Sequence, residues 1–124
     1  MGYESKLIVV NVYDANAHYR ERPYAEVVAE VNCAVMGREF YAFVKQNGKP
    51  IDFDVYIDSE NDPTTEDKYG AALTQIPIGE VIEYLKTDPE MKAYRRAKVL
   101  RGLLTSFKPK EWAGEDIRLV HYGY

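Results

Sequence analysis

The sequence predicts an α+β domain in which two helices pack on one face of an antiparallel sheet of about five strands. Three observations lead to this prediction. The 124 residues are the length of one ordinary domain, so we expect residues 1–124 to form a single domain. Apolar and polar residues alternate over the first half, as in half-buried strands, and a helical spacing follows Pro77. The last residues return to strand composition, which gives the order β-β-β-β-α-α-β.

The first two strands are predicted over residues 6–13 and 24–36. Residues 6–13 are apolar on both faces, so we expect a central strand that is covered on both sides. Residues 24–36 alternate strictly, which predicts one buried face and one polar face. The buried face would carry Ala25, Val27, Ala29, Val31, Cys33 and Val35.

Two more strands are predicted around a tight turn. Residues 40–45 would be the third strand, and Asn47 with Gly48 would form a hairpin turn, because both residues tolerate positive φ. Residues 51–58 would be the fourth strand. Its buried face would carry Ile51, Phe53, Val55 and Ile57, and its exposed face Asp52, Asp54, Tyr56 and Asp58.

Two helices and a final strand complete the prediction. Pro77 can open the first helix, whose apolar residues recur at helical spacing: Ile78, Val81, Ile82 and Leu85. Asp88 and Pro89 predict the start of the second helix, which ends before Pro109. Its apolar stripe would be Ala93, Ala97, Leu100, Leu104 and Phe107. Gly102 weakens it by about 1 kcal/mol relative to Ala, so we expect close packing there. Residues 117–124 have strand composition.

Charge and cysteine content exclude several classes of protein. The net charge of −4, from 20 acidic and 16 basic residues, argues against direct binding of DNA or RNA, which needs a basic surface. The longest apolar run, residues 7–10, is far shorter than the roughly 20 residues of a membrane span, so we expect no membrane partner. The N-terminal residues lack the layout of a secretory signal. Cys33 is the single cysteine, which favours a reducing compartment such as the cytoplasm.

Residues that could carry out catalysis or bind a metal are scarce. His18 and His121 are the only histidines, and one cysteine cannot build a zinc site. Cys33 lies on the predicted apolar face of a strand, where we expect an unreactive thiol. The sequence contains no nucleophile elbow, phosphate loop or dinucleotide-binding motif. We therefore expect a protein that is not an enzyme and has no metal and no cofactor.

The stretch IDFDVYIDSENDPTTEDKYG, residues 51–70, is strongly acidic. As a calcium loop starting at Asp58 it would fail, because Pro63 and Tyr69 occupy the positions of the turn glycine and the bidentate Glu. On a strand, alternate carboxylates would project from one face at intervals of about 6.6 Å and could enter a basic groove of a partner protein. The other interpretation is that they only keep a sheet edge soluble. The candidate protein-binding residues here are Asp52, Asp54, Tyr56 and Asp58.

Two further stretches carry residue types that favour recognition. The loop HYRERPY adds the candidate protein-binding residues Tyr19, Arg20, Arg22 and Tyr24, because Tyr and Arg often anchor interfaces. The chain holds 11 tyrosines, which suit either half-buried sheets or a recognition surface. The stretch KAYRRAKVLR of the second helix is either a solvated face or a patch that contacts the phosphate of a nucleotide. The residues of that patch would be Tyr94, Arg95 and Arg96.

Three segments carry a resemblance to known proteins: MGYESKLIVVN at the start, TEDKYGAALTQIPIGEVIEYL in the middle and VHYGY at the end. Together they resemble a loosely defined group of small, functionally uncharacterised proteins encoded by phages and prophages of bacteria. The resemblance implies an accessory, counter-defence role in the cytoplasm of a bacterial host. Such proteins include anti-CRISPR inhibitors and sponges that sequester a nucleotide immune signal. No site residues can be transferred from the group.

Three functions therefore compete. The first is an anti-CRISPR-like inhibitor that binds a host defence protein through an acidic and Tyr-rich surface. The second is a sponge that sequesters a nucleotide in a pocket containing Arg95 or Arg96 and stacking tyrosines, at the interface of a homo-oligomer. The third is a structural or assembly factor held together by its sheet edges.

Overall fold

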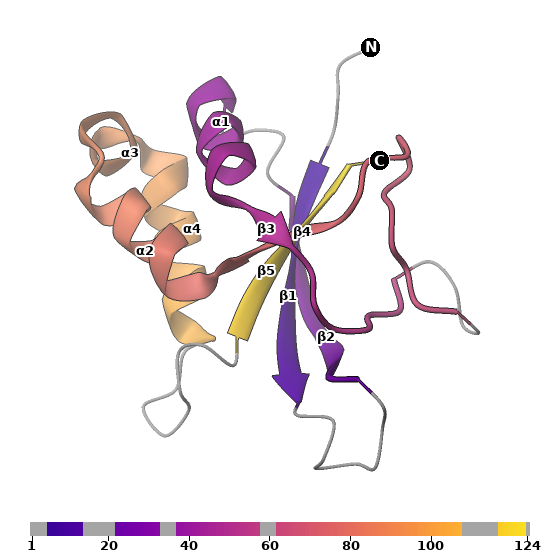
Figure 1. Ribbon diagram of the computed structural model, residues 1–124. Coiled ribbons are helices and arrows are strands. Elements are labelled where there is room, and N and C mark those ends of the chain that lie inside the picture. Colours follow the sequence, from indigo (N-terminus) through magenta and orange to yellow (C-terminus); the bar gives the residue numbers. More distant parts are fainter. Residues whose placement is uncertain (1–4, 14–21, 33–36, 58–61, 108–116, 124) are drawn as a thin grey trace.

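The computed structural model describes residues 5–13, 22–32, 37–57, 62–107 and 117–123. These residues form an antiparallel five-stranded sheet and four helices, which confirms the predicted α+β class. The strands lie in the order β2-β1-β5-β4-β3 (Figure 1). Their bounds are β1 (Ser5–Tyr13), β2 (Tyr24–Asn32), β3 (Lys49–Pro50), β4 (Thr74–Pro77) and β5 (Ile117–Gly123).

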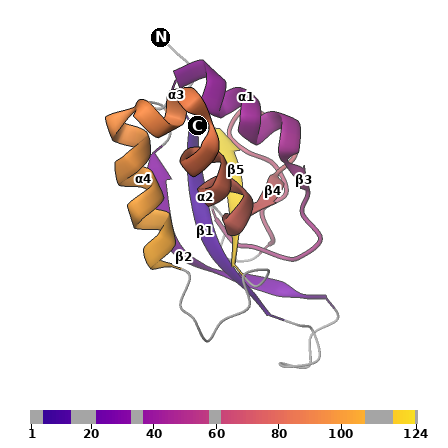
Figure 2. The same cartoon turned by 90° about the vertical axis from the view of Figure 1, so that its left-hand side faces the viewer.

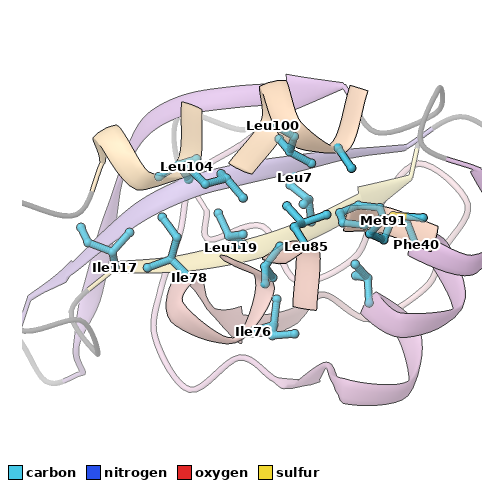
Figure 3. Packing of buried hydrophobic residues seen from close by; sticks show 14 residues of the cluster. Leu7, Phe40, Ile76, Ile78, Leu85, Met91, Leu100, Leu104, Ile117 and Leu119 are labelled. Carbon is cyan, nitrogen blue, oxygen red and sulfur yellow. The ribbon is translucent and has the colours of Figure 1, made fainter. Parts of the chain in front are cut away.

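The described helices all pack on one face of the sheet (Figures 1 and 2). They are α1 (Gly37–Asn47), α2 (Ile78–Thr87), α3 (Pro89–Ala93) and α4 (Arg95–Ser106). Their buried side chains meet those of the sheet in a cluster that we call the helix-side core (Figure 3). Each fully buried apolar side chain contributes about 1.5–3 kcal/mol, so this core dominates the stability of the fold. Its labelled members are Leu7, Phe40, Ile76, Ile78, Leu85, Met91, Leu100, Leu104, Ile117 and Leu119.

The opposite face of the sheet is covered by chain without helices. Residues 51–57 and 62–73 place Phe53, Val55 and Leu73 against this face, and we call the resulting cluster the second core. From the sheet it contains Ile8, Val10, Ala25, Val120 and Tyr122. Because Leu7 and Val9 belong to the helix-side core, strand β1 is buried on both faces, as predicted.

The prediction of a strand over residues 40–45 is wrong, because these residues lie in helix α1. Phe40 and Val44 are four residues apart and both are 1% exposed, and Phe43 packs beside them against the helix-side core. Aromatic and β-branched residues at this spacing fit a strand and a helix equally well. Stacking of the Phe43 ring on Tyr84 of α2, with centroids 3.9 Å apart, is a tertiary contact that favours the helix.

The predicted hairpin turn at Asn47 and Gly48 is also wrong, because Asn47 is the last residue of α1. The Gly48 N–H donates to the carbonyl oxygen of Val44 at 2.9 Å. A Cβ atom at Gly48 would lie 2.9 Å from that same oxygen and 2.9 Å from Thr74 Oγ1. Glycine is therefore required here by a close approach to β4, and not by a turn with positive φ.

Strand β2 does not keep one buried face. Its register with β1 shifts between Val9 and Val10, so that Val28 has no partner in β1 and forms a bulge. Ala25 before the bulge belongs to the second core, whereas Ala29 and Val31 after it pack against the helix-side core. The residues that alternate in the sequence therefore do not share one buried face of the sheet. Val27, which was predicted to be buried, is 43% exposed. Cys33 and Val35 lie outside the described residues.

The prediction of a strand over residues 51–58 is wrong, because residues 51–57 form no strand, but the predicted facing of their side chains is correct. Phe53 and Val55 are buried and Ile51 and Ile57 pack beside them, as the alternation predicted. Among the described residues, the backbone of this segment pairs with the sheet in an isolated parallel bridge between Asp54 and Tyr24 of β2. Because the same segment continues from β3, this bridge links the two opposite edges of the sheet.

The helices after Pro77 follow the prediction with one interruption. Ile78, Val81 and Leu85 of α2 are buried. Asp88 caps α3, because its side chain accepts from the N–H groups of Glu90 and Met91. The predicted second helix is broken at Tyr94, which has extended backbone, so it forms α3 and α4. The described residues do not show the expected close packing at Gly102, because none of their heavy atoms lies within 4 Å of an added Cβ outside the backbone of α4 itself.

Candidate functional site

The acidic stretch and the loop HYRERPY, which are distant in the sequence, meet beside the start of β2. The Asp54 N–H donates to the carbonyl oxygen of Pro23 at 2.9 Å, and the Ala25 N–H donates to the carbonyl oxygen of Asp54 at 2.8 Å. These two bonds align Asp54 with Tyr24, and paired residues project to the same side. Part of the candidate loop HYRERPY and part of the acidic stretch therefore form one surface.

An exposed ion pair lies at the centre of this surface. Arg22 Nε lies 3.6 Å from Asp54 Oδ1, and the two side chains are 58% and 25% exposed. Exposed ion pairs of this kind contribute only about 0–1 kcal/mol, so a charged group of a partner can replace either member. Asp52 lies two residues away and accepts a hydrogen bond from Gln75 Nε2 at 3.2 Å.

Aromatic side chains extend the same surface. The Tyr24 ring stacks on Tyr13 of β1, with centroids 5.2 Å apart and planes inclined by 21°. The Tyr13 hydroxyl accepts from Asn11 Nδ2 at 3.0 Å and donates to Glu26 Oε2 at 3.4 Å. Tyr56 is 39% exposed, since Val55 beside it faces the second core. We call this region the acidic–tyrosine surface: Tyr13, Arg22, Tyr24, Asp52, Asp54 and Tyr56.

Sequence analysis found most of this surface but not all of it. Five of its six residues were candidates, and the exception is Tyr13, which no motif marked. The signal that could have found Tyr13 is its position at the end of a predicted central strand, where cross-strand aromatic pairs stabilise a sheet. The candidates Asp58, Tyr19 and Arg20 lie outside the described residues.

A second candidate site is a groove of about 460 Å³ between the end of β2 and helix α4. Arg95 and Arg96 line one part of it, as the nucleotide hypothesis expects. The remaining described lining is aliphatic apart from Asn32, and includes no aromatic ring: Val31, Val99, Leu100 and Leu103. Tyr94 packs against the helix-side core and accepts from Arg96 Nη1 at 3.4 Å, so it holds an arginine and does not line the groove.

The exposed apolar residues of the groove were missed by the sequence analysis. Helix α4 buries Ala97, Leu100 and Leu104 against the sheet. Val99 and Leu103 each precede a buried leucine by one residue, which turns them by about 100° toward the open side. They are 67% and 44% exposed. Helix periodicity alone identified the buried stripe, but it did not show that nothing described covers the adjacent one.

Of the two histidines, His121 lies among the described residues, and its neighbours are residues of the folded core and its rim. It lies on β5, with its ring centroid 5.5 Å from that of Tyr41. Burial lowers its pKa, Asp67 acts in the opposite direction, and Lys45 lowers the pKa further. Asp67 itself is occupied, because its carboxylate accepts from the N–H groups of Tyr69, Ala71 and Gly123.

Within the described parts of the chain, no three or more His, Cys, Asp or Glu side chains are placed to hold a metal ion. Nor is any helix among these residues both long enough and apolar enough to cross a membrane. Comparisons with protein-family models, with curated proteins and with solved structures found no match to the chain.

Proposed function

We propose that the protein is a non-catalytic binding protein that inhibits a partner protein by docking through its acidic–tyrosine surface. The observation that carries this proposal is the meeting of Arg22, Tyr24 and Asp54, which come from two separate candidate stretches. Tyr and Arg combine large contact areas with hydrogen-bonding groups, and they are the residues most often found at the energetic centre of interfaces.

The chemistry of the surface favours a basic partner. Asp52, Asp54 and Tyr56 alternate with the buried Phe53 and Val55, so all three side chains face away from the second core and are available to a partner. On binding, a basic side chain of the partner would replace Arg22 on Asp54. The net charge of −4 adds a general attraction for basic proteins. The resemblance to phage accessory proteins makes a bacterial defence protein the first class of partner to test.

Charge reversal tests this proposal. The Asp52→Lys, Asp54→Lys variant is expected to lose the partner that the wild-type protein captures from a bacterial lysate, while it keeps its fold. A matched control reverses two exposed carboxylates of α2, Glu80→Lys and Glu83→Lys, and is expected to keep the partner. Thermal unfolding monitored by circular dichroism establishes that both variants are folded. Retention of the partner by the first variant would contradict the proposal.

A second function, sequestration of a nucleotide, is favoured by one observation, that Arg95 and Arg96 line the same groove. Two guanidinium groups would bind a phosphate. Native mass spectrometry of the purified protein would then show bound mass of nucleotide size, which the Arg95→Ala, Arg96→Ala variant lacks. A wild-type protein without bound mass, and without thermal stabilisation by added nucleotides, would exclude this function.

A further inference from the structure

Helix α4 lies beside β2 (Figure 2), and the groove between them has a charged end and an apolar wall. Val99 and Leu103 follow Arg95 at intervals of four residues, so the three side chains lie on one side of α4. At a rise of about 1.5 Å per residue, this stripe is about 12 Å long, with the arginine at its start. Leu100, which is 5% exposed, and Val31 of β2 complete the apolar part. We call the described lining the β2–α4 groove: Val31, Asn32, Arg95, Arg96, Val99, Leu100 and Leu103.

The apolar wall of the β2–α4 groove is open to solvent. Val99 and Leu103 are 67% and 44% exposed, although they lie beside the helix-side core. The volume of the groove, about 460 Å³, is within the range of sites that bind small molecules. An apolar ligand that lies along the stripe would remove both side chains from water, and this removal is the main favourable term in the binding of such a ligand.

The charged end of the groove favours an anion. Arg95 and Arg96 are the first two residues of α4, whose first turn contains no acidic residue, so the helix dipole adds to their positive charge. The described lining of the groove contains no acidic side chain. Each guanidinium group presents a planar fork of N–H donors, which matches the two oxygens of a carboxylate. A carboxylate at this end would therefore complement the charge and the hydrogen-bonding groups of the two arginines.

The rest of the lining distinguishes an aliphatic ligand from a nucleotide. Nucleobases are commonly held by stacking on aromatic rings, and the described lining contains no such ring. The hydrophobic effect has no preferred direction, so an aliphatic lining suits a flexible hydrocarbon chain. We propose that the β2–α4 groove binds a fatty acid of medium chain length. Its carboxylate lies at Arg95 and Arg96, and its chain follows Val99 and Leu103.

This inference does not depend on the proposed function, because the acidic–tyrosine surface and the β2–α4 groove share no residue. Isothermal titration calorimetry of the purified protein with dodecanoate, below the concentration at which micelles form, tests it. We expect saturable binding of one dodecanoate per chain. The affinity should fall about tenfold for every two methylene groups removed, in decanoate and then in octanoate. Dodecanol, which has the chain without the charge, should bind at least about tenfold more weakly than dodecanoate.

Two variants separate the charged end of the groove from its apolar wall. The Arg95→Ala, Arg96→Ala variant should bind dodecanoate at least about tenfold more weakly and should bind dodecanol as the wild-type protein does. The Val99→Gln, Leu103→Gln variant should bind both probes at least about tenfold more weakly, because polar side chains replace the apolar wall.

The matched control removes two exposed lysines that lie outside the described lining, Lys92→Ala and Lys98→Ala, and should bind dodecanoate as the wild-type protein does. All the substituted side chains are exposed, so circular dichroism should show that each variant is folded. Absence of saturable dodecanoate binding would overturn the inference, and so would an affinity that depends neither on chain length nor on the arginines. Tighter binding of dodecyl phosphate, or of a nucleotide, than of dodecanoate would overturn it as well, because the groove would then select a phosphate.

Discussion

The two faces of the sheet are covered in different ways. The helix-side core is covered by four described helices, whose backbone groups are largely satisfied within each helix. The second core is covered by residues 51–57 and 62–73, which depend on individual polar contacts. The Thr64 N–H donates to the carbonyl oxygen of Val55 at 2.7 Å, and the Ile57 N–H donates to Thr64 Oγ1 at 2.8 Å. Apolar packing therefore stabilises the helices on one face of the sheet. Individual hydrogen bonds position residues 51–57 and 62–73 on the other face.

A matched pair of phenylalanine truncations tests this difference most strongly. Phe40 and Phe53 are both 1% exposed, and they lie in the helix-side core and the second core. Truncation of either to alanine should lower the free energy of unfolding by about 3–5 kcal/mol, through lost burial and the remaining cavity. Denaturant unfolding measures both losses. Hydrogen exchange of the Ala25 and Asp54 amides should accelerate in Phe53→Ala beyond the global change, and in Phe40→Ala it should follow the global change only. Equal exchange of these two amides in the two variants would show that the helices and the irregular segments do not differ in how they are held on the sheet.

Asp67 is the polar residue on which the irregular cover depends most. Its carboxylate accepts three backbone N–H groups, from Tyr69, Ala71 and Gly123, and the last of these ties the cover to β5. Asp67→Ala should lower the free energy of unfolding by about 1–3 kcal/mol, because hydrogen bonds to a charged group are lost. The neighbouring Glu66→Ala, at an exposed side chain, should change it by less than about 0.5 kcal/mol. Similar losses from the two variants would remove the special role assigned to Asp67.

Two glycine substitutions are expected to change the free energy of unfolding in opposite directions. Gly48→Ala places a Cβ 2.9 Å from the Val44 carbonyl oxygen and should destabilise the junction of α1 and β4 by about 1–3 kcal/mol. Gly102→Ala adds a Cβ in open space on α4 and should stabilise the protein by about 0.5–1 kcal/mol. The melting temperatures of the two variants should therefore move in opposite directions. A loss of stability in Gly102→Ala would show that this turn of α4 has a neighbour after all.

The smallest expected effect is a dependence of stability on pH at the helix-side face of β5. Burial lowers the pKa of His121 below its ordinary value of 6.5, so the unfolded chain binds a proton more readily than the folded one. The contribution of His121 to the free energy of unfolding should therefore be fully present above pH 6.5. It should decrease as the pH drops toward the pKa of the folded state. His121→Gln should reduce this slope in urea unfolding series at several pH values. An unchanged slope in that variant, and a reduced one in His18→Gln, would assign the effect to the other histidine.

Local patterns were sufficient for the elements whose period is unambiguous. The burial of β1 on both faces, the start of α2 after Pro77, the cap at Asp88 and the final strand were all predictable. The α1 helix was not, because Phe40, Phe43 and Val44 fit either period until Tyr84 is known to stack on Phe43. The bulge at Val28 was not predictable either, since nothing in a regular alternation marks an extra residue.

The candidate surfaces divide in the same way. Residue type alone marked Arg22, Tyr24 and Asp54, but their meeting depends on a bridge between positions 30 residues apart, 24 and 54. No local pattern encodes such a bridge. The arginines of the groove were also marked by type, whereas its apolar wall could be recognised only after the buried side of α4 was known.

The bulge in β2 has a consequence for how the chain can change in length. The residues on either side of Val28, Val27 and Ala29, already face consecutive residues of β1. Deletion of Val28 would therefore leave every other side chain of the strand on its present side, and a regular ladder would result. In an unbulged strand, the loss of one residue moves all later side chains to the opposite face. Position 28 is thus a place where the deletion of one residue is compatible with this fold.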